Sequence, residues 1–82
     1  MITVITTITC PWCTKVKNLL KMHEIPFQEW QPDLDTLRTF MLKHNVRTVP
    51  QVFLDDPLMN ADAQRIGGFE DTQAWINRGQ TL

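Results

Sequence analysis

The chain lacks long hydrophobic runs, a basic N-terminus and any cluster of positive charge. No apolar run approaches the roughly 20 residues of a membrane-spanning helix, and the first residues lack the basic segment that begins a signal peptide. Lysine and arginine total 8 against 9 aspartates and glutamates, and they are scattered. Nucleic-acid binding draws on clustered basic residues. We therefore expect no nucleic-acid partner, no membrane association and a location in the cytoplasm.

Cysteine is also scarce, since the chain contains only Cys10 and Cys13. A second CxxC and an HxxxH motif are missing, and His23 and His44 lie on different segments, which disfavours a four-ligand zinc site. In a reducing compartment a CxxC pair is more often catalytic than structural, and so short a loop would contribute little as a cross-link. A zinc half-site and an ordinary buried pair stay as alternatives, but we expect no bound metal.

The length of the chain allows one domain, spanning residues 1–82, with a modest core. Internal repeats, low-complexity tracts and linkers are missing. Hydrophobic residues make up 43% and charged residues 21%, which is ordinary for a globular domain. We expect this domain to be a monomer.

The hydrophobic pattern predicts strands and helices in the order β-α-β-α-β-β-α. The first strand is β-branched throughout, and the helices show apolar residues at helical spacing. The predicted elements are a strand over 2–6, a helix from Pro11 to about Glu24, a strand over 27–31, a helix from Asp33 to about 44–45, strands over 49–54 and 64–66, and a last short helix capped by Asp71 and ended by Gly79.

This order predicts an α/β protein with a four-stranded mixed sheet and three helices. The first β-α-β unit should place its two strands in parallel through a right-handed crossover. The last two strands, joined by a loop of roughly ten residues, should form an antiparallel hairpin. With helices on both faces of the sheet, the result is the thioredoxin-like layer arrangement.

The sequence Cys10-Pro11-Trp12-Cys13 begins the first predicted helix, where Pro11 suits the first helical position and stiffens the loop. The helix dipole and the unpaired N–H groups there stabilise a thiolate, so Cys10 is expected to be an exposed nucleophile near neutral pH. Cys13, one turn inside, should be more buried and should resolve the mixed disulfide. The pattern indicates thiol–disulfide exchange.

Three short motifs in this order resemble the glutaredoxin family: the CxxC pair after the first strand, Thr48-Val49-Pro50 before a later strand, and Ile66-Gly67-Gly68 before the last helix. The resemblance covers nearly the whole chain. It implies a thiol–disulfide oxidoreductase that takes electrons from glutathione, binds no cofactor and reduces protein disulfides or glutathione mixed disulfides. It also implies a cis peptide bond between Val49 and Pro50.

The resemblance further implies where glutathione binds. The backbone of Val49 would pair with the cysteinyl part, and the helix start at 68–71 would receive the γ-glutamyl carboxylate. Asp71 would hold the α-amino group, or would act only as a helix cap. Arg47 would bind the glycine carboxylate, or would be a solvated loop residue. The implied site comprises Arg47, Thr48, Val49, Pro50, Gly68, Phe69, Glu70 and Asp71.

The chain departs from the family pattern at several points. Trp12 stands where many glutaredoxins have tyrosine, and it is either a flat wall beside the substrate or a core residue of the helix. Thr7, Ile8 and Thr9 fill the stretch where many members carry a lysine. The connection over 55–64 is longer than the usual hairpin turn, and it should project from the end of the sheet opposite the cysteines.

Two other functions stay open. One is a thioredoxin-like electron donor, recharged by a flavin-dependent thioredoxin reductase; either kind of carrier could serve ribonucleotide reductase. The other is an iron–sulfur carrier in which two chains hold a cluster through Cys10 and two glutathiones. Pro11 and Trp12 leave less space for such a cluster than the glycine and serine that are usual there.

Overall fold

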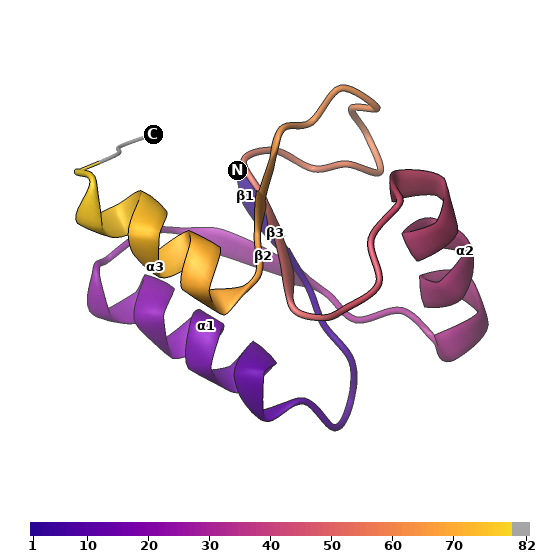
Figure 1. Ribbon diagram of the computed structural model, residues 1–82, viewed down its shortest axis with the longest axis horizontal. Coiled ribbons are helices and arrows are strands. Elements are labelled where there is room, and N and C mark those ends of the chain that lie inside the picture. Colours follow the sequence, from indigo (N-terminus) through magenta and orange to yellow (C-terminus); the bar gives the residue numbers. More distant parts are fainter. Residues whose placement is uncertain (80–82) are drawn as a thin grey trace.

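The computed structural model describes residues 1–79, and its helices and strands follow the predicted order (Figure 1). The strands are short, and each helix begins after a residue in an extended conformation. The elements are β1 (Ile2–Ile5), α1 (Pro11–Met22), β2 (Phe27–Trp30), α2 (Leu34–His44), β3 (Gln51–Phe53), β4 (Arg65–Gly67) and α3 (Phe69–Asn77).

The four strands form one mixed sheet in the order β2-β1-β3-β4. β1 and β2 are parallel, with Ile2 opposite Phe27, and α1 provides the crossover between them. β3 is antiparallel to both β1 and β4. The predicted parallel pair and the predicted antiparallel hairpin are both confirmed.

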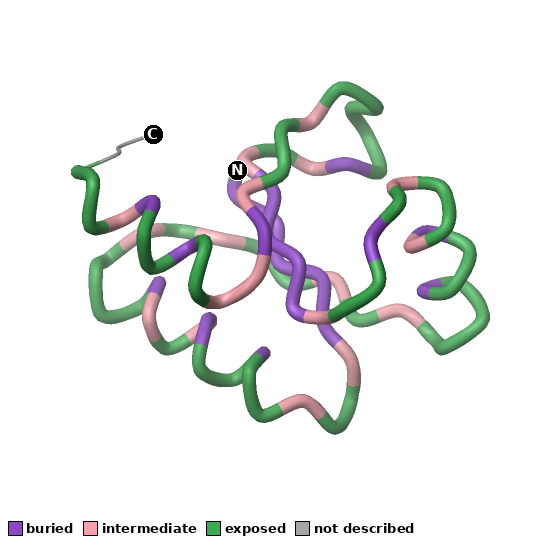
Figure 2. Tube along the Cα trace, in the orientation of Figure 1, coloured by how far each residue is buried: buried purple, intermediate pink, exposed green. Residues whose placement is uncertain are grey.

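Helices cover both faces of the sheet, as predicted. α1 and α3 lie together on one face and α2 lies on the other (Figure 1). Side chains alternate along β1, so Ile2 and Val4 pack with α1 and α3 while Ile5 packs with α2. The buried residues concentrate in these central strands and in the helix faces turned toward them (Figure 2).

The strand boundaries differ from the prediction by one or two residues. β3 begins at Gln51 rather than at residue 49, because Pro50 has no N–H to donate to the sheet. β1 ends at Ile5, although the N–H of Thr6 still donates to the carbonyl of Trp30 at 3.0 Å. The Val49–Pro50 peptide is cis, which confirms what the family resemblance implied.

Two details of the predicted helices were wrong. The N-cap of α3 is Gly68, not Asp71; Asp71 lies inside the first turn, where its carboxylate accepts the Gly68 N–H at 3.4 Å. The apolar spacing of residues 34, 37, 40 and 41 predicts that Leu34 lies on the buried face of α2, but Leu34 is the first residue of that helix and is exposed. The predicted end of α3 at Gly79 holds, because Gly79 follows the C-cap with a φ of +74°.

The segment between β1 and α1 lies at one end of the sheet, and the connection between β3 and β4 lies at the opposite end (Figure 1). The N-terminal amino group, also at that opposite end, lies 3.6 Å from the Asp55 carboxylate. The 55–64 connection therefore projects away from the cysteines, as predicted. Within residues 1–79, no helix has the length and apolar character needed to cross a membrane.

Candidate active site

Cys10 is the N-cap of α1, at the point where the chain leaves the sheet and enters the helix. Its sulfur forms a disulfide with Cys13, and the two Cα atoms are 5.2 Å apart. The backbone N–H of Cys13 points at the Cys10 sulfur, with a nitrogen–sulfur distance of 3.1 Å. When the disulfide is reduced, a donor in this position stabilises negative charge on Cys10, as does the helix dipole.

The two sulfur-bearing residues differ in exposure. Cys13 is 2% exposed and lies on the buried face of α1 with Val16 and Leu20, whereas Cys10 is partly exposed. Because Cys13 is buried, a bulky disulfide substrate can reach Cys10 more readily than Cys13. The predicted difference in burial is therefore confirmed.

Two lysines of α1 lie near the cysteines, and each has a partner. The Lys15 ammonium lies 4.1 Å from the centre of the Trp12 ring, a cation–π arrangement. The Lys17 ammonium lies 3.0 Å from the Glu29 carboxylate, which also accepts the Thr6 hydroxyl at 2.7 Å. The Thr6 hydrogen bond, together with Lys17, lowers the pKa of Glu29.

A groove of about 430 Å³ lies beside the Cys10–Cys13 loop, between the segment 48–51 and the start of α3. We call it the glutathione groove, in keeping with the expectation from sequence. It brings together most of the predicted binding residues. They are Thr48, Val49, Pro50, Gly68, Phe69, Glu70 and Asp71; Trp12 of the redox loop lines the groove with them.

Trp12 forms one wall of the glutathione groove. It is 49% exposed, which argues against the core alternative, and its ring centre lies 5.5 Å from that of Phe69. The pair joins the start of α1 to the start of α3, so the redox loop and the helix N-terminus are held side by side. The first N–H groups of α3 have no acceptor within the helix and are suited to a carboxylate.

Two residues of the glutathione groove, Gln51 and Arg65, were missed by the sequence analysis. Gln51 is 5% exposed and donates through its amide to the Thr48 carbonyl oxygen at 2.9 Å. The Arg65 guanidinium donates to the Gln51 side-chain oxygen at 3.1 Å. A glutamine among the apolar residues of a predicted buried strand was the one available signal for this network.

Arg47 lies outside the lining of the glutathione groove, on the exposed segment directly before Thr48. His23 and His44 lie at the C-terminal ends of α1 and α2, at positions that do not line it either. His44 stacks on Phe40 with ring centres 4.2 Å apart. Burial of the imidazole, and secondarily Lys43, lowers the pKa of His44.

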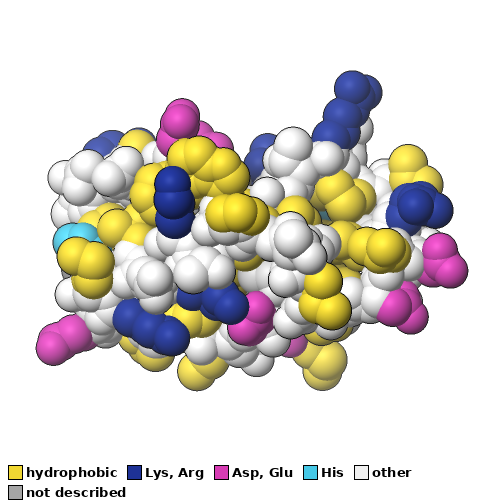
Figure 3. All heavy atoms as spheres, turned by 90° about the horizontal axis from the view of Figure 1, so that it is seen from below, with side chains coloured by type: hydrophobic (Ala, Val, Ile, Leu, Met, Phe, Trp, Pro, Cys, Tyr) yellow, Lys and Arg dark blue, Asp and Glu magenta, His cyan; other side chains and the backbone are white. Residues whose placement is uncertain are grey.

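The surface around the site carries charges of both signs. In the view from the end that bears the Cys10 loop, lysines and arginines alternate with acidic and hydrophobic side chains (Figure 3). In the part of the chain that the structure describes, no three histidine, cysteine, aspartate or glutamate side chains come together in a way that could hold a metal ion.

Comparison with known proteins gives consistent results. The glutaredoxin family model matches residues 2–59. Glutaredoxin 3 of Escherichia coli is 41% identical over 73 residues, which cover 87% of this chain and 80% of that protein. The structure of glutaredoxin 1 from Francisella tularensis superimposes with a TM-score of 0.77 at 27% identity, covering 94% of this chain and 92% of that one. A buckwheat glutaredoxin solved in complex with glutathione has a TM-score of 0.74 at 23% identity, covering 95% and 69%.

Proposed function

This chain belongs to the glutaredoxin family of glutathione-dependent thiol–disulfide oxidoreductases, and on that premise we propose the role of each residue in its site. Cys10 is the nucleophile and Cys13 is the resolving thiol. The observation that carries this assignment is the asymmetry of the pair: Cys10 is partly exposed at the helix N-cap with a backbone N–H on its sulfur, and Cys13 is buried.

The reaction follows from this geometry. The Cys10 thiolate attacks one sulfur of a substrate disulfide, forming a mixed disulfide and releasing the other sulfur as a thiolate that takes up a proton. Cys13, deprotonated in turn, attacks the Cys10 sulfur and releases the second substrate thiol. Two electrons have then passed to the substrate, and the Cys10–Cys13 disulfide remains. Two glutathione molecules restore the dithiol and become glutathione disulfide.

Glutathione binds in the glutathione groove. The backbone of Val49, on the segment shared with Thr48 and Pro50, pairs with the cysteinyl part. At the α3 N-terminus, formed by Gly68, Phe69 and Glu70, backbone N–H groups donate to the γ-glutamyl carboxylate. Asp71 holds the α-amino group while its carboxylate also accepts the Gly68 N–H. Arg47 and Arg65 are the two cations available for the glycine carboxylate; Arg65 lines the groove and Arg47 precedes it.

Trp12 and Pro11 shape the entrance to the reactive sulfur. Trp12 offers its ring as a flat wall to the bound tripeptide, and its contact with Phe69 fixes that wall. Pro11, the first residue of α1, restricts the loop between the two cysteines. The protein acts, in this proposal, as a one-domain monomer over residues 1–82 in a reducing compartment such as the cytoplasm, on disulfide-containing proteins.

A second candidate is a thioredoxin-like electron donor recharged by thioredoxin reductase. The observation that favours it is the segment Thr7-Ile8-Thr9, which places no cation beside Cys10 where many relatives have a lysine. Either donor could have ribonucleotide reductase as its partner. The glutathione-dependent reaction is the better supported, because the glutathione groove combines a helix N-terminus, Asp71 and Arg65 in one place.

The test treats the oxidised protein with graded glutathione and follows both cysteines by mass spectrometry. Conversion to the dithiol at millimolar glutathione, through a protein glutathionylated on Cys10, supports the proposal. A Cys10–Cys13 disulfide that persists at that concentration, but is reduced by a thioredoxin reductase, supports the second candidate.

Two single-cysteine variants check the order of events. Cys10→Ser should lose all activity, because the remaining thiol is buried. Cys13→Ser should keep the reduction of glutathione mixed disulfides, which needs one thiol, and should accumulate a mixed disulfide with dithiol-dependent protein substrates. Full activity in Cys10→Ser would reverse the assignment.

A further inference from the structure

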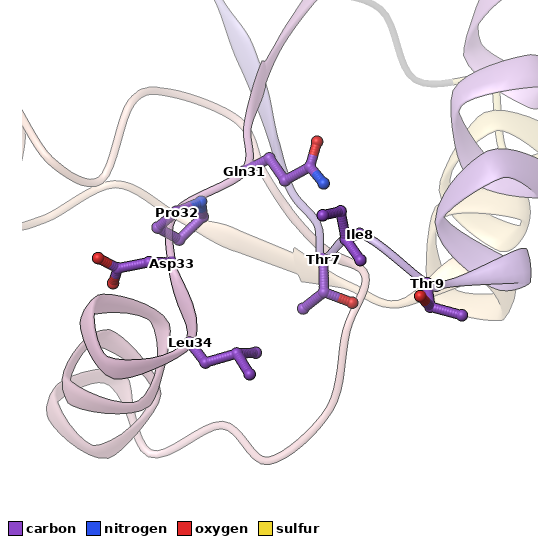
Figure 4. A pocket seen from close by; sticks show the side chains of 7 residues that line it. All are labelled: Thr7, Ile8, Thr9, Gln31, Pro32, Asp33 and Leu34. Carbon is purple, nitrogen blue, oxygen red and sulfur yellow. The ribbon is translucent and has the colours of Figure 1, made fainter.

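A second groove, of about 880 Å³, lies at the carboxyl ends of the parallel strands β1 and β2 (Figure 4). Its walls come from two segments, the one that follows β1 and the one that joins β2 to α2. We call it the Ile8–Leu34 groove. It is lined by Thr7, Ile8, Thr9, Gln31, Pro32, Asp33 and Leu34.

The groove exposes two large aliphatic side chains that face the same space. Ile8 is 89% exposed and Leu34 is 67% exposed. In Figure 4 the Gln31 and Leu34 side chains point toward the Thr7–Thr9 segment. Neither aliphatic side chain belongs to a core cluster of the sheet. Packing within the fold therefore does not explain why two large apolar side chains stand here, and such exposed apolar surface is typical of a binding site.

The Ile8–Leu34 groove continues into the space over the reactive sulfurs. Thr7, Ile8, Thr9 and Gln31 also line a smaller hollow whose other walls include Cys10 and Cys13. The glutathione groove shares no lining residue with the Ile8–Leu34 groove. A polypeptide bound to Cys10 as a mixed disulfide therefore has an open path to the apolar side chains of the Ile8–Leu34 groove, on the side of the loop away from the glutathione groove.

The charges in the Ile8–Leu34 groove do not suit glutathione. Asp33 is the one charged side chain among the described residues that line it, and its carboxylate points away from Thr7–Thr9 (Figure 4). That carboxylate accepts the Thr36 N–H at 2.8 Å, and the hydrogen bonds from Thr36 lower the pKa of Asp33. An anionic tripeptide with two carboxylates finds no cation in this lining, whereas an uncharged apolar side chain finds Ile8, Pro32 and Leu34.

We propose that the Ile8–Leu34 groove binds an apolar side chain of the disulfide-containing polypeptide substrate, about two residues from the cysteine that Cys10 attacks. The spacing follows from chain geometry: Ile8 and Cys10 are two residues apart, so their Cα atoms lie within about 7.6 Å of each other. An extended peptide advances about 3.3 Å per residue, so two residues span that distance. This inference rests on the proposed role of Cys10 as the nucleophile.

The probes are two synthetic octapeptides, each oxidised to a symmetrical disulfide dimer. They are identical except for leucine or serine at the positions two residues before and after the single cysteine. The reduced protein, without glutathione, converts each dimer to two peptide thiols as its own dithiol becomes the Cys10–Cys13 disulfide. The single-turnover rate is measured for the wild type, for Ile8→Ser/Leu34→Ser, and for the control Met22→Ser/Leu42→Ser.

The control variant removes two apolar side chains of comparable exposure that lie outside the groove, since Met22 and Leu42 are each 79% exposed. The wild type and the control should reduce the leucine dimer about tenfold faster than the serine dimer, as expected from partial burial of a leucine side chain. The groove variant should lose this preference through a slower reaction with the leucine dimer.

Equal rates for the two dimers in the wild type, or an unchanged preference in the groove variant, would overturn the docking inference while leaving the dithiol chemistry in place. A rise in the KM for glutathione in the groove variant would assign the groove to glutathione and overturn it too. Failure of the wild type to reduce either dimer would instead reject the proposed role of Cys10, and the docking inference with it.

Discussion

The guanidinium of Arg65 donates a hydrogen bond to the side-chain oxygen of Gln51, with an Nη1–Oε1 distance of 3.1 Å. This bond orients the Gln51 amide so that its nitrogen faces Thr48, where it donates to the carbonyl oxygen at 2.9 Å and to the hydroxyl at 3.3 Å. Because Gln51 is buried, its amide is held in one orientation and connects Arg65 to Thr48. Strand β4 thereby positions the segment that begins the glutathione groove.

Gln51→Glu tests this link. A glutamate keeps the size of the side chain and its bond to Arg65, but it has no N–H to donate and places an oxygen against the Thr48 carbonyl. We expect the free energy of unfolding in urea to fall by about 1–3 kcal/mol. We also expect kcat/KM for a glutathionylated peptide to fall about tenfold, mainly through KM.

The control is Gln73→Glu, the same exchange at an exposed position of α3. It should change the free energy of unfolding by less than about 0.5 kcal/mol and leave the KM where it is. Equal stability and equal KM in the two variants would mean that Gln51 does not hold the 48–50 segment.

Gly67 and Gly68 offer a matched pair at the other edge of the glutathione groove. Gly67 has a φ of +130°, and a Cβ atom there would lie 2.8 Å from the Cβ of Asp71. Gly68 has a φ of −87°, and the nearest atom to an added Cβ is the Pro50 oxygen at 3.6 Å. Gly67→Ala should therefore destabilise the protein by about 2 kcal/mol or more, and Gly68→Ala by less than about 1 kcal/mol.

Thermal unfolding of the two alanine variants and of Gly67→Ala/Asp71→Ala separates the two causes. The double variant removes the Asp71 carboxylate group, whose Cγ would also lie 2.8 Å from the added Cβ, but it keeps the Cβ of residue 71 and the positive φ. It should therefore recover part of the loss and not all of it. Equal melting temperatures for the two single variants would contradict this account.

The fold and the reactive pair could be predicted because each depends on local sequence. The β-branched run at 2–6, Pro11 at the first helical position and the Asp33 cap determine where strands and helices begin, and the structure has them within one or two residues. Most residues of the glutathione groove could be predicted only from the family resemblance and not from their spacing. They lie far apart in the chain and come together only in the folded protein.

The missed and misplaced residues depend on tertiary contacts. Arg65 reaches Gln51 because β3 and β4 pair with Phe53 opposite Arg65 across an irregular register, which no periodicity reveals. Trp12 fits the helical spacing of the core residues of α1, yet it lies in the first turn of that helix, is 49% exposed and contacts Phe69 at the start of α3. The cap of α3 was misplaced because Asp71 bonds back to Gly68 from inside the helix.

His44 gives a pH dependence of stability in the mildly acidic range. Burial lowers its pKa in the folded protein below 6.5, so the unfolded chain binds more protons between the folded pKa and 6.5. The free energy of unfolding should therefore fall as the pH decreases through this window. His44→Gln should abolish that slope in urea titrations, whereas His23→Gln, which removes the other imidazole, should retain it. The same slope in both variants would exclude His44 as the cause.

Lys17 and Glu29 form an ion pair beside the two cysteines, and the net charge of this pair should affect the ionisation of Cys10. Both residues line the hollow that contains Cys10 and Cys13, and at 3.0 Å the Glu29 carboxylate neutralises the ammonium. Glu29→Gln removes the negative charge and leaves Lys17 facing the reactive pair, which favours the Cys10 thiolate. The reduced variant should therefore be alkylated by iodoacetamide several-fold faster than the wild type at about pH 6, where less of a thiol is ionised.

Glu24→Gln removes an acidic group of the same kind from an exposed position just past the end of α1, outside the lining of that hollow. Its alkylation rate should match that of the wild type. If the two variants react at the same rate, the effect is one of net charge and not of the Lys17–Glu29 pair. Adding Lys17→Met to Glu29→Gln should return the rate toward the wild-type value, because the ammonium that Glu29 had neutralised is then gone.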